Sequence, residues 1–290
     1  MDELRTRWSP ESHEHKVETF YSIGADRFGD CHGGYLNFGL WDGEGWDYVR
    51  AAENLVHSLA RWGCISSVSK VLDVGCGFGA QDVYLAHQFQ PRSLSCVDVA
   101  WPHVLESRRR ADAAGLGPSV QFHHGSATDL RAFAPGSFSH VLAVEGIVHF
   151  DTRARFFAEA HRVLEPGGQI LVADYALRRI PRGPLDRAFV ALACFGWRIP
   201  RENASTIDLY RAALAAAGFV DIQIESAGAR TIPHYFREQR TRVHRRALSD
   251  IRGSAATWFG LLFDTLVYWA WARGQLDYVL VRARKEQSRS

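Results

Sequence analysis

The feature that most constrains this chain is a short apolar run that ends in three closely spaced glycines, Val71-Leu-Asp-Val-Gly75-Cys-Gly77-Phe-Gly79. The helix-forming residues that begin at Ala80 follow at once, so the pattern predicts a buried strand that turns directly into a helix. Glycines allow such a tight turn and let a ligand approach the backbone where no Cβ stands in the way. The first turn of a helix also offers unpaired N–H groups and the positive end of its dipole. The segment therefore predicts a site for a nucleotide-like ligand.

Short apolar runs alternate with helical stretches through most of the chain, which predicts an α/β fold. Parallel strands joined by right-handed helical crossovers give a doubly wound sheet with helices on both faces. We expect this sheet to be seven-stranded and mostly parallel. The predicted strands are 70–74, 94–99, 120–123, 139–144, 169–175, 219–225 and 275–283, and the predicted helices of the core are 80–89, 101–114, 152–164 and 207–217.

The regular alternation is absent from three segments, which suggests the domain organisation. Residues 1–68 precede the first strand and contain a glycine- and aromatic-rich loop followed by a helical stretch, so we expect an N-terminal lid. The core then spans 69–290, with insertions at about 177–204, where three prolines occur, and at the helical stretch 233–273. These three parts are rich in aromatic residues, which suits a pocket for an apolar ligand.

Composition and charge limit the functional classes. The formal net charge is only +2, so the chain has no strong field to attract nucleic acid. The cysteine count of five is odd and no C-x-x-C pair occurs, so neither a disulfide framework nor a metal site is expected. The first residues, MDELRTRW, lack the pattern of a secretion signal, which predicts a cytoplasmic protein.

The run from Trp258 to Ala272 is apolar on all sides, with Asp264 as its one charged residue. It is shorter than the roughly 20 residues that a membrane span requires. A helix that is apolar all round must be buried or lie against something. We expect it to pack on the core or on the pocket; a homodimer contact and a shallow membrane contact are the alternatives.

The identity of the nucleotide-like ligand is not settled by the glycines alone. Gly75 and Gly77 with Ala80 also fit the dinucleotide pattern G-x-G-x-x-G/A, and Asp98 could hold a ribose diol of either ligand. The third glycine, Gly79, and the position of Asp73, beside the expected place of a cationic amino-acid tail, favour S-adenosyl-L-methionine. A nicotinamide-dependent oxidoreductase and a non-catalytic cofactor-binding scaffold remain the rival hypotheses.

The series of motifs resembles the class I S-adenosylmethionine-dependent methyltransferases. It consists of VLDVGCGFG, Asp98, HGSATDL (124–130), GSFSHVLAVEGIVHF (136–150) and HRVLEPGGQILVADY (161–175), in that order. The likeness covers roughly residues 15–226 and is greatest to the branch with quinone, tocopherol and sterol methyltransferases. It implies a Rossmann-like methyltransferase fold and methyl transfer to a small, largely apolar or aromatic acceptor, such as a natural product, isoprenoid, quinone or lipid-like molecule. Whether carbon, oxygen or nitrogen is methylated stays open.

The resemblance also implies cofactor contacts. Asp98 would hold the ribose hydroxyls, with Val99 against the adenine. The family usually has G-D-A after the third strand, whereas this chain has Gly125-Ser126-Ala127, so either Ser126 or Asp129 would take the place of the missing acid. The remaining implied contacts are Gly75, Gly77 and Gly79 to the methionine moiety and ribose, Ala127 and Thr128 beside the adenine, and Tyr21 or Tyr35 to the cofactor carboxylate.

Two residues after the fourth strand are candidates for catalysis, because ligands in open α/β sheets lie beyond the carboxyl ends of the strands. His149 could remove a proton from an acceptor hydroxyl or amine, and Glu145 could act at a carbon centre or contact the cofactor. Alternatively, Glu145 anchors the lid and His149 caps the helix that begins near Thr152. The residues expected in the substrate pocket are Trp41, His149, Tyr175, Trp197 and Tyr235.

Overall fold

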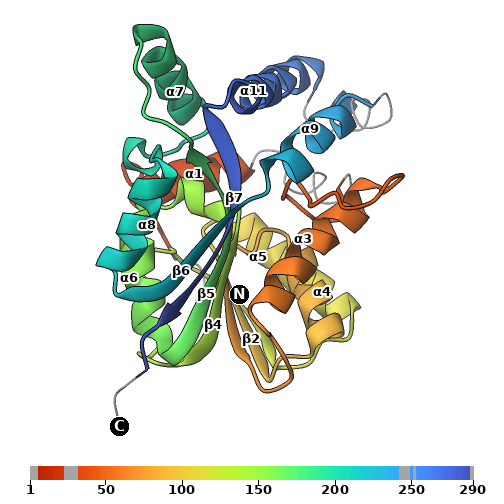
Figure 1. The fold of residues 1–290 in the computed structure, drawn as a ribbon. Helices are drawn as coiled ribbons and strands as arrows, with labels where there is room; N and C mark the ends of the chain where they lie inside the picture. The colour runs from red at the N-terminus through yellow and green to blue at the C-terminus, as the bar shows by residue number, and fades with distance from the viewer. Residues whose placement is uncertain (1–5, 23–31, 242–248, 251–252, 288–290) are drawn as a thin grey trace.

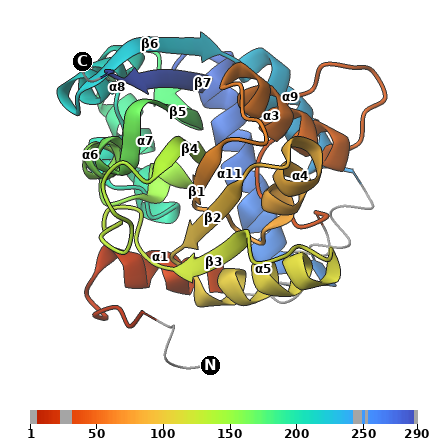
Figure 2. The ribbon, with the colours of Figure 1, turned by 90° about the horizontal axis from the view of Figure 1, so that it is seen from below.

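The computed structural model describes residues 6–22, 32–241, 249–250 and 253–287. These residues form one seven-stranded sheet with the strand order β3-β2-β1-β4-β5-β7-β6 (Figure 1). All neighbouring strands from β3 to β5 are parallel, and β7 runs antiparallel to both β5 and β6. The predicted α/β class and mostly parallel sheet are therefore confirmed. Figure 2 shows β3 and β6 at the two edges of the sheet.

The strands follow the apolar runs of the sequence closely. They are β1 (Lys70–Val74), β2 (Ser93–Asp98), β3 (Val120–His124), β4 (Phe138–Val144), β5 (Leu164–Leu177), β6 (Phe219–Ser226) and β7 (Leu276–Lys285). The helices of the sheet layers and of the N-terminal part are α1 (His13–Ser22), α3 (Tyr48–Trp62), α4 (Ala80–Phe89), α5 (Trp101–Ala113), α6 (Arg153–Val163) and α8 (Ile207–Ala216). The others are α7 (Pro184–Gly196), α9 (Gly228–Glu238), α11 (Ser254–Ala272) and the 3-10 turns η2 (Gly146–His149) and η3 (Arg201–Asn203).

Helices cover both faces of the sheet because successive strand residues point to opposite sides. In β1, Val71 packs with α3, α4 and α5, whereas Leu72 and Val74 pack with α6 and α8. Figure 1 shows α3, α4 and α5 on one side of the sheet and α6 and α8 on the other. The central strands β1 and β4 are apolar on both faces, as expected for a sheet buried between two layers, whereas the edge strand β6 is polar on one face.

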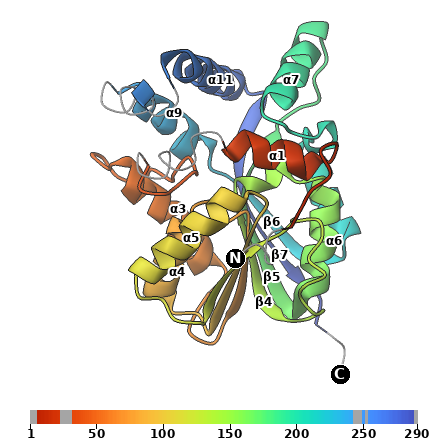
Figure 3. The same cartoon turned by 180° about the vertical axis from the view of Figure 1, so that it is seen from behind.

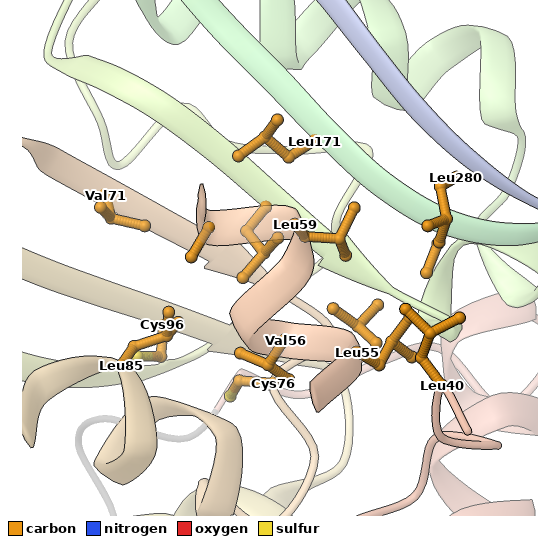
Figure 4. Packing of buried hydrophobic residues seen from close by; sticks show 14 of the residues in the cluster. Leu40, Leu55, Val56, Leu59, Val71, Cys76, Leu85, Cys96, Leu171 and Leu280 are labelled. Carbon is orange, nitrogen blue, oxygen red and sulfur yellow. The ribbon is translucent and has the colours of Figure 1, made fainter. Parts of the chain in front are cut away.

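Helix α3 illustrates how the sequence builds the first layer. Asp47 caps it by accepting a hydrogen bond of 2.8 Å from the backbone N–H of Arg50. Leu55 and Leu59, one helical turn apart, are fully buried in the same apolar cluster as Leu171 of β5 (Figure 4). Burial of each such side chain stabilises the fold by about 1.5–3 kcal/mol.

Four segments differ from the sequence-based expectations. Helix α1 was not predicted, and β5 begins earlier, at Leu164, because Leu164 pairs with Phe138 of β4 before an irregularity that contains Pro166-Gly167-Gly168. The proline-rich insertion contains a regular helix, α7, which starts at Pro184, a position where a missing N–H costs nothing. The described residues of the helical stretch 233–273 include α9, α11 and the helical residues 249–250 between them, and α9 begins ahead of Pro233 and includes it.

The helices outside the two layers gather at one end of the sheet. Helices α1, α7, α9 and α11 lie beyond the carboxyl ends of the parallel strands, and Figure 3 shows α1 crossing this end between α5 and α7. Both α9 and α11 belong to the connection between β6 and β7, which leaves the sheet at this same end. This arrangement encloses the edge where parallel α/β sheets bind ligands.

Helix α11 contains the apolar run that begins at Trp258. Phe263 and Ala270 are buried, whereas Trp258 and Trp269 are half exposed or more. The prediction that this helix packs on the rest of the molecule is confirmed for one of its sides. No helix in the described part of the chain combines enough length and apolar character to cross a bilayer.

Candidate functional site

The glycine turn after β1 adopts the backbone conformation that only glycine takes easily. Gly75, Gly77 and Gly79 have φ angles of 81°, 59° and 77°, in the left-handed region. Gly75 and Gly77 lie on the wall of a large cavity. Gly79 does not: a Cβ there would come within 2.8 Å of the Cβ of Ser107 on α5. The third glycine therefore allows close packing of α4 on α5 and lies off the cavity wall, and its expected cofactor contact stays a prediction.

Asp98 ends β2 beside this turn and lies on the same cavity wall. One carboxylate oxygen accepts a hydrogen bond of 2.9 Å from the backbone N–H of Gly77, and the other accepts one of 2.8 Å from that of Ala100. His103 Nδ1 lies 3.2 Å from the second oxygen. A carboxylate has about four acceptor positions, so with these three contacts Asp98 retains capacity for about one ligand hydroxyl.

The loop after β3 forms the next part of the wall. Ser126 Oγ donates to the carboxylate of Glu14 on α1 at 3.0 Å, and it lies 3.0 Å from the hydroxyl of Thr128, which is itself outside the cavity. Asp129 instead pairs with Arg131 through hydrogen bonds of 2.7 and 2.6 Å and is also outside the cavity. The acid nearest to Ser126 on the wall is thus Glu14. Further residues of this wall are Val97, Val99, Gly125 and Ala127.

Asp73 does not line the cavity. Its side chain is fully buried beneath the glycine turn and accepts a hydrogen bond from Gln81 Nε2. Burial raises the pKa of Asp73 to about 6, against the opposing effects of hydrogen bonds from neighbouring side chains. Gln81 itself lies on the cavity wall, so α4 places its amide there, whereas β1 keeps the Asp73 carboxylate behind the wall.

Glu145 follows β4 and joins three separate parts of the chain. Its Oε1 accepts a 2.6 Å hydrogen bond from the backbone N–H of Phe38 and another of 2.6 Å from the Tyr278 hydroxyl. Its Oε2 accepts a 3.0 Å bond from the Tyr175 hydroxyl. Burial raises the pKa of Glu145 to about 7, although these three donors lower it. Glu145 therefore fastens the N-terminal segment to β5 and β7 while lining the cavity.

His149 pairs with Tyr21, which lies 128 residues earlier in the sequence, on α1. The Tyr21 hydroxyl is 2.7 Å from His149 Nε2, and both residues line the cavity. Burial lowers the pKa of His149 to about 4, so its imidazole is neutral near pH 7. Burial and then the nearby charges of Asp98 and Glu145 raise the pKa of Tyr21. The two neutral side chains form a hydrogen-bonded pair through which a proton can be passed. His149 does not cap α6, in contrast to the alternative prediction.

The aromatic residues expected at the site occupy different positions. Tyr35 lines the cavity, but its hydroxyl points to Glu53 Oε1 at 3.4 Å and to a backbone carbonyl at 3.5 Å. Tyr235 stacks on Phe38 with ring centroids 3.8 Å apart and lines the cavity. Trp41 stays outside, because its Nε1 donates to the Phe38 carbonyl at 3.0 Å and so braces the loop.

The cavity enclosed by these residues has a volume of about 240 Å³. It brings together most of the residues singled out from the sequence: Tyr21, Tyr35, Gly75, Gly77, Asp98, Val99, Ser126, Ala127, Glu145, His149, Tyr175, Trp197 and Tyr235. It leaves out Trp41, Asp73, Gly79 and Thr128.

Sequence reasoning missed several wall residues, chiefly those of α1. Glu14, Val17 and Phe20 line the cavity from this helix, whose short and weakly amphipathic sequence gave no clear helical signal. Asp264 of α11 also reaches the wall, and its position as the lone charge in an apolar run was the available signal. Within the described residues, no cluster of three or more His, Cys, Asp or Glu side chains is arranged to hold a metal; the expected absence of a metal site stays a prediction.

Comparison with known proteins adds an independent line of argument. Residues 71–168 match the methyltransferase domain family. The erythromycin 3''-O-methyltransferase of Saccharopolyspora erythraea is 32% identical over 226 residues, which cover 76% of this chain and 72% of that protein. An S-adenosyl-L-methionine-dependent Diels-Alderase of Talaromyces variabilis is 24% identical over 237 residues, covering 78% and 80% of the two chains.

A solved structure is similar in fold over almost the whole chain. The geranyl diphosphate C-methyltransferase from Streptomyces coelicolor, in complex with Mg²⁺, geranyl-S-thiolodiphosphate and S-adenosyl-L-homocysteine, superposes with a TM-score of 0.74. The match covers 96% of this chain and 100% of that chain at 17% sequence identity. At this identity the likeness concerns the fold alone.

Proposed function

The chain belongs to the S-adenosylmethionine-dependent methyltransferases, and from that premise we propose that it methylates a hydroxyl oxygen of a small, largely apolar acceptor. Its cofactor is S-adenosyl-L-methionine, and the similarities do not support the nicotinamide-dependent oxidoreductase that the glycines alone left open. The observation that carries the choice of oxygen is the neutral Tyr21–His149 pair, which lies on the same cavity wall as the glycine turn and Asp98.

The residues of the cavity fit the cofactor. Gly75 and Gly77 present backbone where a Cβ would narrow the space, since a Cβ on Gly77 would lie 3.1 Å from a methyl carbon of Leu36. Asp98 would accept a hydrogen bond from a ribose hydroxyl, and Gln81 would face the amino-acid tail. When bound, S-adenosyl-L-methionine supplies an electrophilic methyl group.

Glu14 and Ser126 would recognise the adenine amino group. The family acid at this position is a serine here, and the 3.0 Å bond between Ser126 and Glu14 supports a replacement of that acid from another part of the chain. Val99 and Ala127 would flank the adenine ring, as the resemblance implies. Because Glu14 belongs to α1, cofactor binding would also hold this helix over the site.

The Tyr21–His149 pair would remove the proton of the acceptor hydroxyl. The hydroxyl gives its proton to the Tyr21 oxygen as the Tyr21 proton passes to His149 Nε2. A neutral imidazole can take that proton, and the low pKa of His149 is sufficient because an alcohol oxygen becomes strongly acidic as its new bond to carbon forms. General-base assistance of this kind contributes about 10²–10⁴-fold in rate.

Glu145 would act as a positioning residue in this scheme. Both of its oxygens are used by Phe38, Tyr175 and Tyr278, so it holds the N-terminal segment in place over the cavity. This supports the anchoring hypothesis for Glu145. A direct role at a carbon centre, or a contact with the cofactor, stays a prediction.

The acceptor would lie between the N-terminal segment and the two insertions. Tyr175, Trp197, Tyr235 and Phe150 form an aromatic wall that suits an apolar molecule such as a natural product, isoprenoid, quinone or lipid-like compound. This supports a division into an N-terminal lid (1–68) and a core (69–290) whose insertions at about 177–204 and 233–273 shape the pocket. Parts of the lid and of the second insertion lie outside the described residues.

The remaining proposals concern the setting of the enzyme. A small-molecule acceptor agrees with the enclosed cavity, whereas the net charge of +2 offers nothing to hold a nucleic acid. A cytoplasmic location and a homodimer stay predictions.

The test uses S-adenosyl-L-methionine with a deuterated methyl group and pairs of apolar compounds that differ only in one free hydroxyl. Suitable pairs are a macrolide glycoside, a prenylated hydroquinone and a terpene alcohol, each beside its O-blocked analogue. We expect the label on oxygen in at least one hydroxyl compound, by mass spectrometry and NMR, and none in its analogue. Label on carbon or nitrogen would contradict O-methylation, and a rearranged but unlabelled product would favour an activity like that of the Diels-Alderase relative.

A further inference from the structure

A second cavity lies beside the first, where β5 ends between α7 and α11. Its volume is about 100 Å³. Its wall is mostly hydrocarbon, with Leu177 from β5, Val190 and Ala193 from α7, and Leu266 and Ala270 from α11. A cavity with such walls is suited to an apolar group and is poorly suited to a cluster of water molecules.

The two cavities are adjacent, because they share wall residues. Val148, Tyr175 and Trp197 line both of them. Trp197 follows α7 and packs against Phe263 of α11, with ring centroids 6.1 Å apart. These three side chains therefore form part of the boundary between the two cavities.

One cation, Arg153, lies on the wall of the second cavity, and it is the only charged side chain among the described residues there. It is 5% exposed. Its Nε and Nη2 bind the two carboxylate oxygens of Asp174 at 2.7 and 3.1 Å, and Nη2 also donates to the Tyr175 carbonyl at 2.8 Å. The third nitrogen, Nη1, is buried and has no hydrogen-bond partner in the described structure.

The side chains bonded to Arg153 have hydrogen-bond partners of their own, in contrast to its Nη1. Asn203, which lies on the same wall, accepts from the Arg153 backbone N–H at 2.9 Å and donates to two backbone carbonyls at 2.9 and 2.8 Å. Asp174 also accepts from Tyr210 at 3.1 Å. Leaving a guanidinium N–H without a partner in an apolar environment is costly, so such a group is most simply explained by a ligand oxygen that completes it.

We propose that the second cavity binds the non-reacting end of the acceptor, a compact hydrocarbon group that carries one oxygen bonded to Arg153 Nη1. Identifying the bound molecule as the acceptor rests on the proposed function. An engineered apolar cavity of roughly 150 Å³ holds benzene, so a cavity of about 100 Å³ suits a branched alkyl group or five-membered ring with a carbonyl, ether or hydroxyl oxygen. The enzyme would thus select acceptors by a feature remote from the methylated atom.

The test measures binding of two isosteric probes, cyclopentanone and methylenecyclopentane, by ligand-observed NMR with the full chain saturated with S-adenosyl-L-homocysteine. We expect the ketone to bind about tenfold more tightly than the hydrocarbon, because only the ketone can accept from Arg153 Nη1. In Ala270→Leu, whose larger side chain fills the cavity, ketone affinity should fall at least tenfold. Ala272→Leu on the exposed side of the same helix is the matched control and should stay within twofold of the wild type.

Arg153→Lys keeps the charge beside Asp174 but loses Nη1, so the preference for the ketone should disappear while the hydrocarbon still binds. If the Arg153→Lys variant does not fold, Ala270→Leu still tests whether the ketone binds in the second cavity, since this variant leaves the Arg153–Asp174 pair intact. Equal binding of both probes to the wild type, or unchanged ketone binding in Ala270→Leu, would overturn the proposal. Calorimetry with S-adenosyl-L-homocysteine alone, and the same probe measurements without it, distinguish failure of the proposed function from failure of this proposal. If S-adenosyl-L-homocysteine does not bind, the proposed function is refuted, and the probe affinities measured in its absence still test the second cavity.

Discussion

Replacing Tyr21 with phenylalanine tests the proposed proton relay with the smallest change to the site. The substitution removes the hydroxyl that lies 2.7 Å from His149 Nε2 and keeps the ring, which packs edge-on against His149 and His103 at 5.3 and 5.6 Å. The apolar packing of α1 is therefore retained. What is lost is the atom through which the acceptor proton reaches the imidazole.

The expected loss is 10²–10⁴-fold in kcat, the usual contribution of a general base. At 1.36 kcal/mol per factor of ten, this is about 3–5 kcal/mol of transition-state stabilisation. The affinity for S-adenosyl-L-homocysteine should change by less than threefold, because the proposed cofactor contacts are made by other residues. Tyr35→Phe is the matched control: its ring lines the same cavity, but its hydroxyl points to Glu53, so kcat should stay within threefold of the wild type.

The pH dependence gives a second readout of the same step. The pKa of His149 is lowered from its ordinary value to about 4, so the imidazole stays neutral as the pH falls through 6.5. The kcat of the wild type should fall as the pH approaches 4, and Tyr21→Phe should lose this acidic limb, whereas a step near pH 7 in both enzymes would reflect Glu145, whose pKa burial raises to about 7. A Tyr21→Phe enzyme with near wild-type kcat, or one that keeps the limb near pH 4, would refute the relay.

Three further predictions concern the cofactor site and the fold. Asp98→Ala should weaken S-adenosyl-L-homocysteine binding tenfold or more in calorimetry, since hydrogen bonds to a charged group are worth about 1.5–3 kcal/mol each; unchanged affinity would exclude the ribose contact. The wild type should bind S-adenosyl-L-homocysteine more tightly than S-inosyl-L-homocysteine, which lacks the amino group, and Glu14→Ala should remove that difference; a preference that persists would assign adenine recognition to other residues. Gly79→Ala should lower the melting temperature by several degrees more than Gly115→Ala, because both residues have positive φ but only Gly79 faces a contact, 2.8 Å from Ser107 Cβ; equal shifts would argue against tight packing at Gly79.

The free energy of unfolding should also depend on pH through the buried His149. Because the folded pKa of His149 lies below its unfolded value, the unfolded chain binds the proton more readily, and stability is lost as the pH falls from about 6.5 toward 4. This contribution is absent in His149→Phe, so the pH dependence of its unfolding free energy in urea should be shallower in that window. An identical slope in both proteins would show that His149 is not held neutral by burial.

The sequence alone determined the features that depend on local conformation. The strand that ends in Gly75 and Gly77, the helix that starts at Ala80 and the carboxylate at the end of β2 were all predicted, because apolar periodicity and glycine φ angles are properties of short segments. The seven strands were located for the same reason. Helix α7 was not predicted because its segment contains prolines, which usually interrupt a helix. Pro184, however, is its first residue, where a proline is tolerated.

Only the tertiary structure decided which side chains meet in the cavity. The pairing of Tyr21 with His149, and that of Glu14 with Ser126, joins residues more than one hundred positions apart, through a helix that has little helical signal of its own. Asp129 was the nearer candidate for the adenine acid, yet its own neighbour Arg131 binds it. The sequence likewise gives no indication that one nitrogen of Arg153 lacks a hydrogen-bond partner. Such contacts depend on how distant elements pack, and packing is decided by the whole core, whereas strands, turns and helix starts follow from their own few residues.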